Sequence, residues 1–160
     1  MNTNTRTMSL GQSLMFAITI VLVALAAFMA GTSTAGAQSA DDDAITWLYV
    51  DDSTGDVALV TAMPFEDQVT QREAVSAIES VIDEELDDAE PMKLDRDLAK
   101  YCSAATGDMD GTTMTVIGCY HDETLVLIMA TDPDVATEFA ENMIDDGEPT
   151  TPAGYTDMSE

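Results

Sequence analysis

The stretch 101–120 reads YCSAATGDMDGTTMTVIGCY, and it decides the fold that we predict for this chain. Asp110-Gly111 separates two runs that are rich in strand-forming residues. Asp-Gly is a favoured two-residue hairpin turn, because both of its positions need positive φ. If these residues form the turn, Met109 faces Thr112, and every step outward adds another facing pair. The stretch is therefore predicted to be an antiparallel β-hairpin.

The two cysteines of the chain face each other in this register. Cys102 and Cys119 form the eighth pair from the turn, at a non-hydrogen-bonded position. Cα atoms at such a position lie about 4.5 Å apart, which is within the range that a disulfide spans. The register therefore predicts a Cys102–Cys119 disulfide independently of the cellular compartment, unless a bulge at Gly107 shifts the pairing.

Three further strands are expected around this hairpin. β-Branched and aromatic residues predict a strand over 45–50, turn residues follow over 51–55, and a second strand is expected over 57–63. Pro64 ends that second strand. Five consecutive apolar residues, 125–129, suit a central strand that is covered on both faces. The sequence thus predicts about five strands.

Two helices complete the predicted elements. A capping box at 70–73 starts the first helix, whose amphipathic pattern continues to about Leu86. Asp132 and Pro133 supply the N-cap and the first position of the second helix, and Gly147 closes it. Both helices have one apolar stripe and one acidic face, which is typical of helices that pack on a sheet.

The predicted fold class is α+β. We expect a two-layer domain with an antiparallel sheet of about five strands and two helices on one face, in the order ββαβββα. The domain covers residues 45–147, which is long enough for a single core. Residues 148–160 contain two prolines and no apolar run, so they are predicted to form a disordered tail.

The first forty residues contain no acidic side chain, and Arg6 is their only charged residue. An apolar run over 14–30 is followed by the small-residue motif AGA at 35–37. A positive start, an apolar run and a small-x-small motif are the three parts of a secretory signal peptide. The sequence therefore predicts a signal peptide, 1–37, that is cleaved before Gln38.

An uncleaved membrane anchor is the alternative for this segment. Its 17 apolar residues lie at the short limit for crossing a bilayer. In either case residues 38–44 are predicted to be a flexible linker. The predicted location is secreted or extracytoplasmic, or membrane-anchored with the domain outside. A disulfide agrees with both locations, because disulfides persist in oxidising compartments.

The charge of the chain restricts its partners. It has 31 acidic and five basic residues, and cleavage before Gln38 would leave 123 residues with a net charge of −27. Such a charge excludes nucleic acid as a partner and argues against docking on anionic lipid, so membrane contact is expected only through residues 14–30 of an uncleaved chain. The acids occur throughout residues 41–160. This dispersion favours a solvated coat adapted to a saline medium over an acidic face for a cationic partner or divalent cations.

No pattern in the sequence predicts a catalytic, cofactor or metal site. Aligning Gly111 with the glycine of a calcium-binding loop places Thr106 and Ile117 where carboxylates are needed. His121 is the only histidine, so a histidine-based zinc site is not expected. No motif places a nucleophile beside it, and we interpret it as an exposed turn residue rather than a general base.

The sequence therefore predicts an exported small acidic domain without enzymatic activity that binds another protein or the cell envelope. Two alternatives stay open, an inhibitor of an exported hydrolase and a small secreted hydrolase that uses carboxylates. An inhibitor would need an exposed apolar patch or a protruding loop. A hydrolase would need two carboxylates that converge in a cleft, and so acidic a chain offers too many pairs to choose one without geometry.

Overall fold

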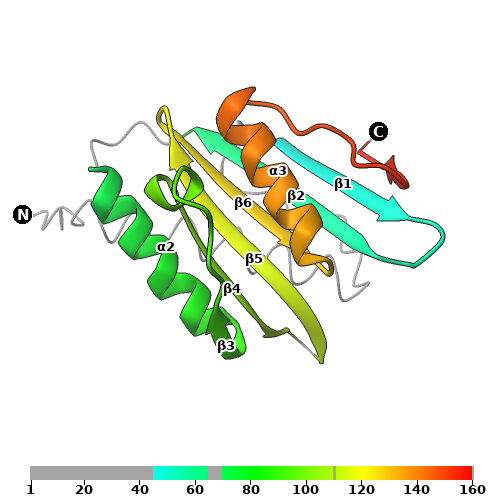
Figure 1. The fold of residues 1–160 in the computed structure, drawn as a ribbon, viewed down its shortest axis with the longest axis horizontal. Helices are drawn as coiled ribbons and strands as arrows, with labels where there is room; N and C mark the ends of the chain where they lie inside the picture. The colour runs from blue at the N-terminus through cyan, green and yellow to red at the C-terminus, as the bar shows by residue number, and fades with distance from the viewer. Residues whose placement is uncertain (1–44, 65–69, 110, 160) are drawn as a thin grey trace, which may run out of the picture.

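The computed structural model describes residues 45–64, 70–109 and 111–159. Within these ranges seven strands form one antiparallel sheet, in the order β3-β4-β5-β6-β2-β1-β7, and two α-helices pack on it (Figure 1). The elements are β1 (Ile45–Asp51), β2 (Val57–Pro64), α2 (Gln71–Glu85), β3 (Asp87–Pro91), the 3-10 helix η1 (Leu98–Lys100), β4 (Cys102–Met109), β5 (Thr112–His121), β6 (Thr124–Ala130), α3 (Pro133–Asp145) and β7 (Tyr155–Asp157). The predicted signal peptide, 1–37, and linker, 38–44, lie outside the described residues.

The hairpin of β4 and β5 has the predicted register. Met109 pairs with Thr112, and the pairing continues without a shift through Gly107 to Cys102 and Cys119. These two cysteines form a disulfide with an S–S distance of 2.08 Å. The second turn residue, Gly111, has a φ of 84°, as the predicted turn requires. The α+β class and the disulfide are thus confirmed, while the other turn residue, Asp110, lies outside the described residues.

Both helices begin as predicted. Thr70 accepts a hydrogen bond from the backbone N–H of Glu73, whose carboxylate accepts one from the N–H of Thr70 at 3.0 Å. Asp132 caps α3 by accepting from the N–H of Asp134 at 2.9 Å. Past the end of α3, Gly147 has a φ of 74°. The contacts of Thr70, Glu73 and Asp132 satisfy backbone N–H groups that the first turns leave without a helical partner.

The sheet has seven strands rather than the predicted five, because each of its two edges has a short strand that the sequence did not indicate. β3 pairs with β4, and β7 pairs with β1. β3 has the sequence DDAEP, in which acidic residues and a proline give no strand signal. Proline is tolerated there because an edge strand leaves one side of its backbone unpaired.

The prediction of a disordered tail over 148–160 is wrong for its described part. Three register pairs join β7 to β1, and the N–H of Met158 donates to the carbonyl of Leu48 at 2.7 Å. The N–H of Leu48 donates in turn to the hydroxyl of Ser159 at 2.9 Å. Pro152 is buried, and Tyr155 packs against the core under α3. The tail therefore covers the outer edge of β1.

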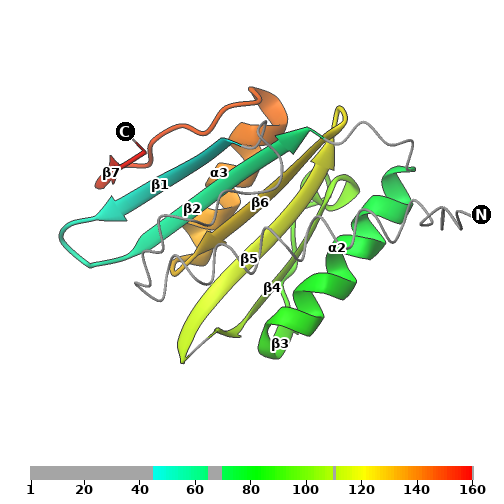
Figure 2. The same cartoon turned by 180° about the vertical axis from the view of Figure 1, so that it is seen from behind.

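The two helices lie on opposite faces of the sheet, which corrects the prediction that both lie on one face. α2 packs against β4 and β5, whereas α3 packs against β5, β6 and β2. α3 lies in front of the sheet in Figure 1 and behind it in Figure 2. Along β6, Leu127 belongs to the core under α2 and its neighbour Ile128 to the core under α3. The architecture therefore has three layers.

The apolar run of β6 required this arrangement. Successive side chains of a strand point to opposite faces, so five consecutive apolar residues need cover on both. Residues 125–130 are all buried, at 3% exposure or less. α3 packs on one face of β6, and on the other face Leu125, Leu127 and Met129 share a core cluster with apolar residues of α2.

Candidate functional site

A pocket of about 260 Å³ opens between the β5–β6 turn and the C-terminal end of α3. Its lining includes His121, Asp122, Thr124, Met143, Asp145 and Asp146. These residues come from the end of β5, the turn, the start of β6 and the last turn of α3. The pocket therefore lies on the α3 face of the sheet, where the helix ends.

The β5–β6 turn holds one wall of this pocket in a strained conformation. Asp122 and Glu123 have φ values of 47° and 58°, in the left-handed region that residues other than glycine rarely adopt. A two-residue turn with both positions at positive φ matches the twist of the strands that it joins. His121 and Thr124 pair directly across it. The turn thus places Asp122 beside the imidazole of His121.

His121 is half-buried at the end of β5, not a fully exposed turn residue as the sequence suggested. Its side chain is 29% exposed, and its Nδ1 lies 3.6 Å from Oδ2 of Asp122. On its other side the edge of the ring meets Tyr101, with the two ring centroids 4.7 Å apart and the planes at 81°. The imidazole therefore lies between an aromatic ring and a carboxylate.

The floor of the pocket is apolar and its rim is acidic. Val126 and Met143 line it and are buried, at 3% and 5% exposure. Asp145 and Asp146 are exposed at its rim. The last turn of α3 contains no basic residue, so nothing there offsets the partial negative charge of the helix C-terminus. Carboxylates and helix dipole together give the pocket a negative potential.

The carboxylates and apolar side chains of this pocket are chemically suited to a cationic group with a hydrocarbon stem. Cys102 and Cys119 are both committed to the disulfide, so they offer no thiolate. Among the described residues, no group of three or more His, Cys, Asp or Glu side chains is placed to hold a metal ion. The pocket offers apolar side chains for a hydrocarbon stem, and the carboxylates of Asp122, Asp145 and Asp146 for a positive end.

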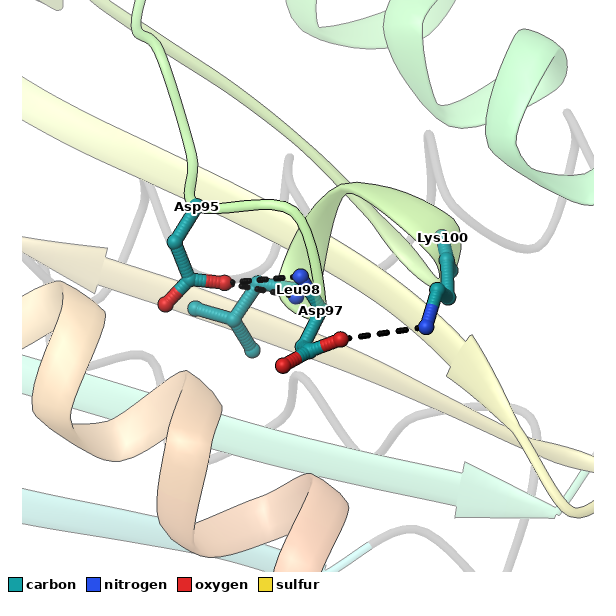
Figure 3. A network of polar contacts seen from close by, with 4 residues as sticks. All are labelled: Asp95, Asp97, Leu98 and Lys100. Atoms are coloured by element: carbon teal, nitrogen blue, oxygen red, sulfur yellow. Dashed lines mark hydrogen bonds and ion pairs between the residues drawn. The ribbon is translucent and has the colours of Figure 1, made fainter.

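A second polar network, at η1, has a structural role (Figure 3). Oδ1 of Asp95 accepts hydrogen bonds from the N–H groups of Asp97 and Leu98, at 3.0 and 2.9 Å. The ammonium of Lys100 lies 3.0 Å from Asp97, a hydrogen bond and ion pair that raises the pKa of the lysine. The short helix lies beside β4 and α3, where Leu98 is buried in the core under α3.

The sequence did not predict this pocket. Among its residues, the sequence indicates a candidate functional group only at His121, and no motif connects this histidine with Asp145 or Asp146. Ile144 lies 23 positions after His121 in the sequence, so only the return of α3 over the sheet brings the two residues together. The disulfide, in contrast, was predictable because a hairpin register depends on residues that are close in sequence.

Comparison with known proteins identifies no family. No protein-family model matches the chain, and no curated protein sequence matches it significantly. Within the described ranges, no helix is long and apolar enough to cross a membrane. The functional conclusion therefore depends on the residues and the geometry of the site.

Proposed function

We propose that this protein is an exported, non-enzymatic interaction module, and that the pocket at the end of α3 receives a cationic group of its partner. The observation that carries the proposal is the composition of the pocket, which is lined by Asp122, Asp145 and Asp146 together with the apolar side chains of Val126 and Met143. A lysine or arginine side chain has the matching chemistry, because its stem is apolar and its end is charged. The module would thus recognise a basic residue displayed by a protein or by the cell envelope.

The export part of the proposal is supported by the disulfide and by the sequence of residues 1–37. A buried disulfide is expected in an oxidising compartment. The acidic coat supports it as well, since surface carboxylates keep an exported domain hydrated and apart from other copies. The inhibitor and carboxylate-hydrolase alternatives stay predictions from the sequence.

A titration with charged peptides tests the pocket. The probes are two capped tripeptides, glycine-lysine-glycine and glycine-glutamate-glycine, added to the isotopically labelled protein at low salt. We expect the lysine peptide to shift the amide resonances of Thr124 and Gly147, because both residues line the pocket. The glutamate peptide should leave them in place.

A matched pair of variants separates the pocket from the general acidity. Asp145→Asn/Asp146→Asn removes two charges at the rim, whereas Asp83→Asn/Glu84→Gln removes two exposed charges from α2 on the other face. The first variant should weaken lysine-peptide binding by at least about fivefold, in line with the loss of two charge-assisted contacts. If both variants weaken it equally, the attraction comes from the net charge and the proposed site is wrong.

A further inference from the structure

The pocket at the end of α3 contains the only histidine of the chain. His121 lines it together with Asp122, Asp145 and Asp146. Histidine is the type of side chain whose charge ordinarily changes between about pH 5 and 8. A proton on this imidazole therefore places a positive charge inside a pocket whose other charged groups are negative.

The side chain of His121 lies on the face of the sheet that α3 covers. Side chains alternate along a strand, so His121 shares a face with Cys119, two positions earlier in β5. Cys119 belongs to the core under α3, whereas Tyr120 belongs to the core under α2. The ring of Tyr101, which directly precedes β4, contacts the imidazole with its centroid 4.7 Å away. The imidazole therefore belongs to the pocket side of the sheet.

The charged groups around the imidazole are carboxylates. From the turn, Oδ2 of Asp122 lies 3.6 Å from Nδ1, and Glu123, the next residue, is exposed. From the end of α3, Asp145 and Asp146 line the same pocket. The residues that β6 contributes to the lining are uncharged, and no lysine or arginine of the described part of the chain lines it. Protonation of His121 thus changes the sign of one group in an acidic site.

We propose, on the basis of the function proposed for this pocket, that His121 makes it a pH-dependent site. The pocket holds a basic side chain while the imidazole is neutral and releases it when the imidazole is protonated. Two effects of the proton act in the same direction. The imidazolium repels the ammonium or guanidinium of the ligand, and it attracts the carboxylate of Asp122, which then offers less negative potential to the ligand.

The expected change in affinity follows from Coulomb's law. Two unit charges roughly 6 Å apart change an affinity by about threefold at the dielectric constant of water, and by more at the lower effective dielectric near a protein. The imidazole is only 29% exposed, so water screens it incompletely. We therefore expect the affinity for the capped lysine tripeptide to fall by at least about threefold between about pH 7.5 and 5.5.

Two variants at position 121 test the direction of the effect. His121→Gln cannot take up the proton, so its affinity for the lysine peptide should stay high at both pH values. His121→Lys has a positive charge at both, so its affinity should be low at both. Circular dichroism checks that each variant is folded. A folded His121→Gln protein with the pH dependence of the parent would show that another group responds to the proton, which overturns the proposal.

The imidazole of the unmodified protein supplies an independent readout. Because the chain has one histidine, the carbon-bound protons of this ring give unambiguous resonances. By linkage, a ligand that is released by protonation must itself oppose protonation. Saturating lysine peptide should therefore move the titration of these resonances to lower pH, whereas the glutamate peptide should not. A titration that bound lysine peptide leaves in place would contradict the role of His121.

The outcomes separate this role from the function of the pocket. If the lysine peptide shifts the resonances of Thr124 and Gly147 with the same affinity at both pH values, the binding site stands and the role of His121 is rejected. If the peptide binds at neither pH, the site is rejected and the role of His121 with it.

Discussion

Cys102 and Cys119 face each other across β4 and β5, with their Cα atoms 4.0 Å apart and both side chains at 3% exposure or less. The covalent bond closes a loop with a sequence separation of 17 residues. Its main effect is on the unfolded chain, whose conformational entropy it reduces, and a loop of this length corresponds to about 3 kcal/mol. That is a large share of the stability of a small domain.

We therefore predict that Cys102→Ala/Cys119→Ala lowers the free energy of unfolding by about 3 kcal/mol. The melting temperature should fall by more than about ten degrees, measured by circular dichroism at fixed salt. Reduction of the unmodified protein by dithiothreitol under denaturing conditions, followed by thiol blocking, is the control. An unchanged melting temperature of the variant would show that the bond contributes nothing.

Tyr49 is the most buried tyrosine, and its ring lies 4.7 Å from that of Phe139 between centroids. Burial, and secondly the charge of Asp157, raises the pKa of its hydroxyl from 10 to about 12. The folded state therefore favours the neutral phenol more than the unfolded state does. This contribution to stability is complete below pH 10 and is lost as the pH rises from 10 through 12.

The corresponding prediction is that the free energy of unfolding falls steeply above pH 10, and that Tyr49→Phe makes this fall shallower. Burial also raises the pKa of Tyr155, so part of the pH dependence should remain in the variant. Denaturant titrations between pH 9 and 11.5 measure the slope. A variant with the same slope as the parent protein would mean that Tyr49 ionises equally well in the folded state.

Among the elements, α2 lies close to the sheet because β5 contributes a glycine beneath it. A Cβ placed on Gly118 would lie 2.3 Å from Cγ2 of Ile78, much closer than carbon atoms approach. Ile78 is completely buried. The missing side chain therefore allows the middle of α2 to approach β5, and the contact decides how high the helix lies above the sheet.

Gly118→Ala should accordingly destabilise the protein by about 1–3 kcal/mol, the usual cost of overpacking a core. Ile78→Ala opens a cavity and is destabilising by itself. Because the two changes occupy the same space, the double variant should lose less stability than the two single variants together. Urea unfolding of all four proteins measures this coupling, and additive losses would contradict the contact.

The strands differ in how far their own sequences predict them. β1, β2, β4, β5 and β6 have β-branched or apolar side chains that pack on the core, so composition indicates them. β3 and β7 are held mainly by backbone hydrogen bonds to an edge that already exists. Every residue except proline offers both of those backbone groups, so the side chains of DDAEP and YTD did not indicate these edge strands.

For the whole molecule, acidity and apolar surface are separated in space. The exposed acids of α2, such as Glu79 and Asp83, lie on its outer side, and others occupy turns and edge strands. The core clusters on the two faces of the sheet contain apolar side chains. Among the described residues, Lys100 forms an ion pair with Asp97, and His121 lies within ion-pair distance of Asp122. No other pair of basic and acidic side chains is that close in the part of the chain that the structure describes. Repulsion between carboxylates is thus largely uncompensated.

This charge distribution predicts that the melting temperature rises steadily with sodium chloride up to molar concentrations, because salt screens the repulsion. The control is the melting temperature at an equal concentration of an uncharged osmolyte, which is excluded from the protein surface but does not screen charge. A sharp gain at millimolar calcium, with little effect of sodium chloride, would instead indicate a specific cation site.

The sequence alone determined the features that depend on residues close together in the chain. The Asp-Gly turn set the register that joins Cys102 to Cys119, and local capping residues set where both helices begin. The tertiary structure decided the rest: the face on which each helix lies, the edge strands, and the pocket between His121 and Asp146. Those features arise from contacts between residues far apart in the chain, and the local pattern of an amphipathic helix is the same whichever face of the sheet it covers.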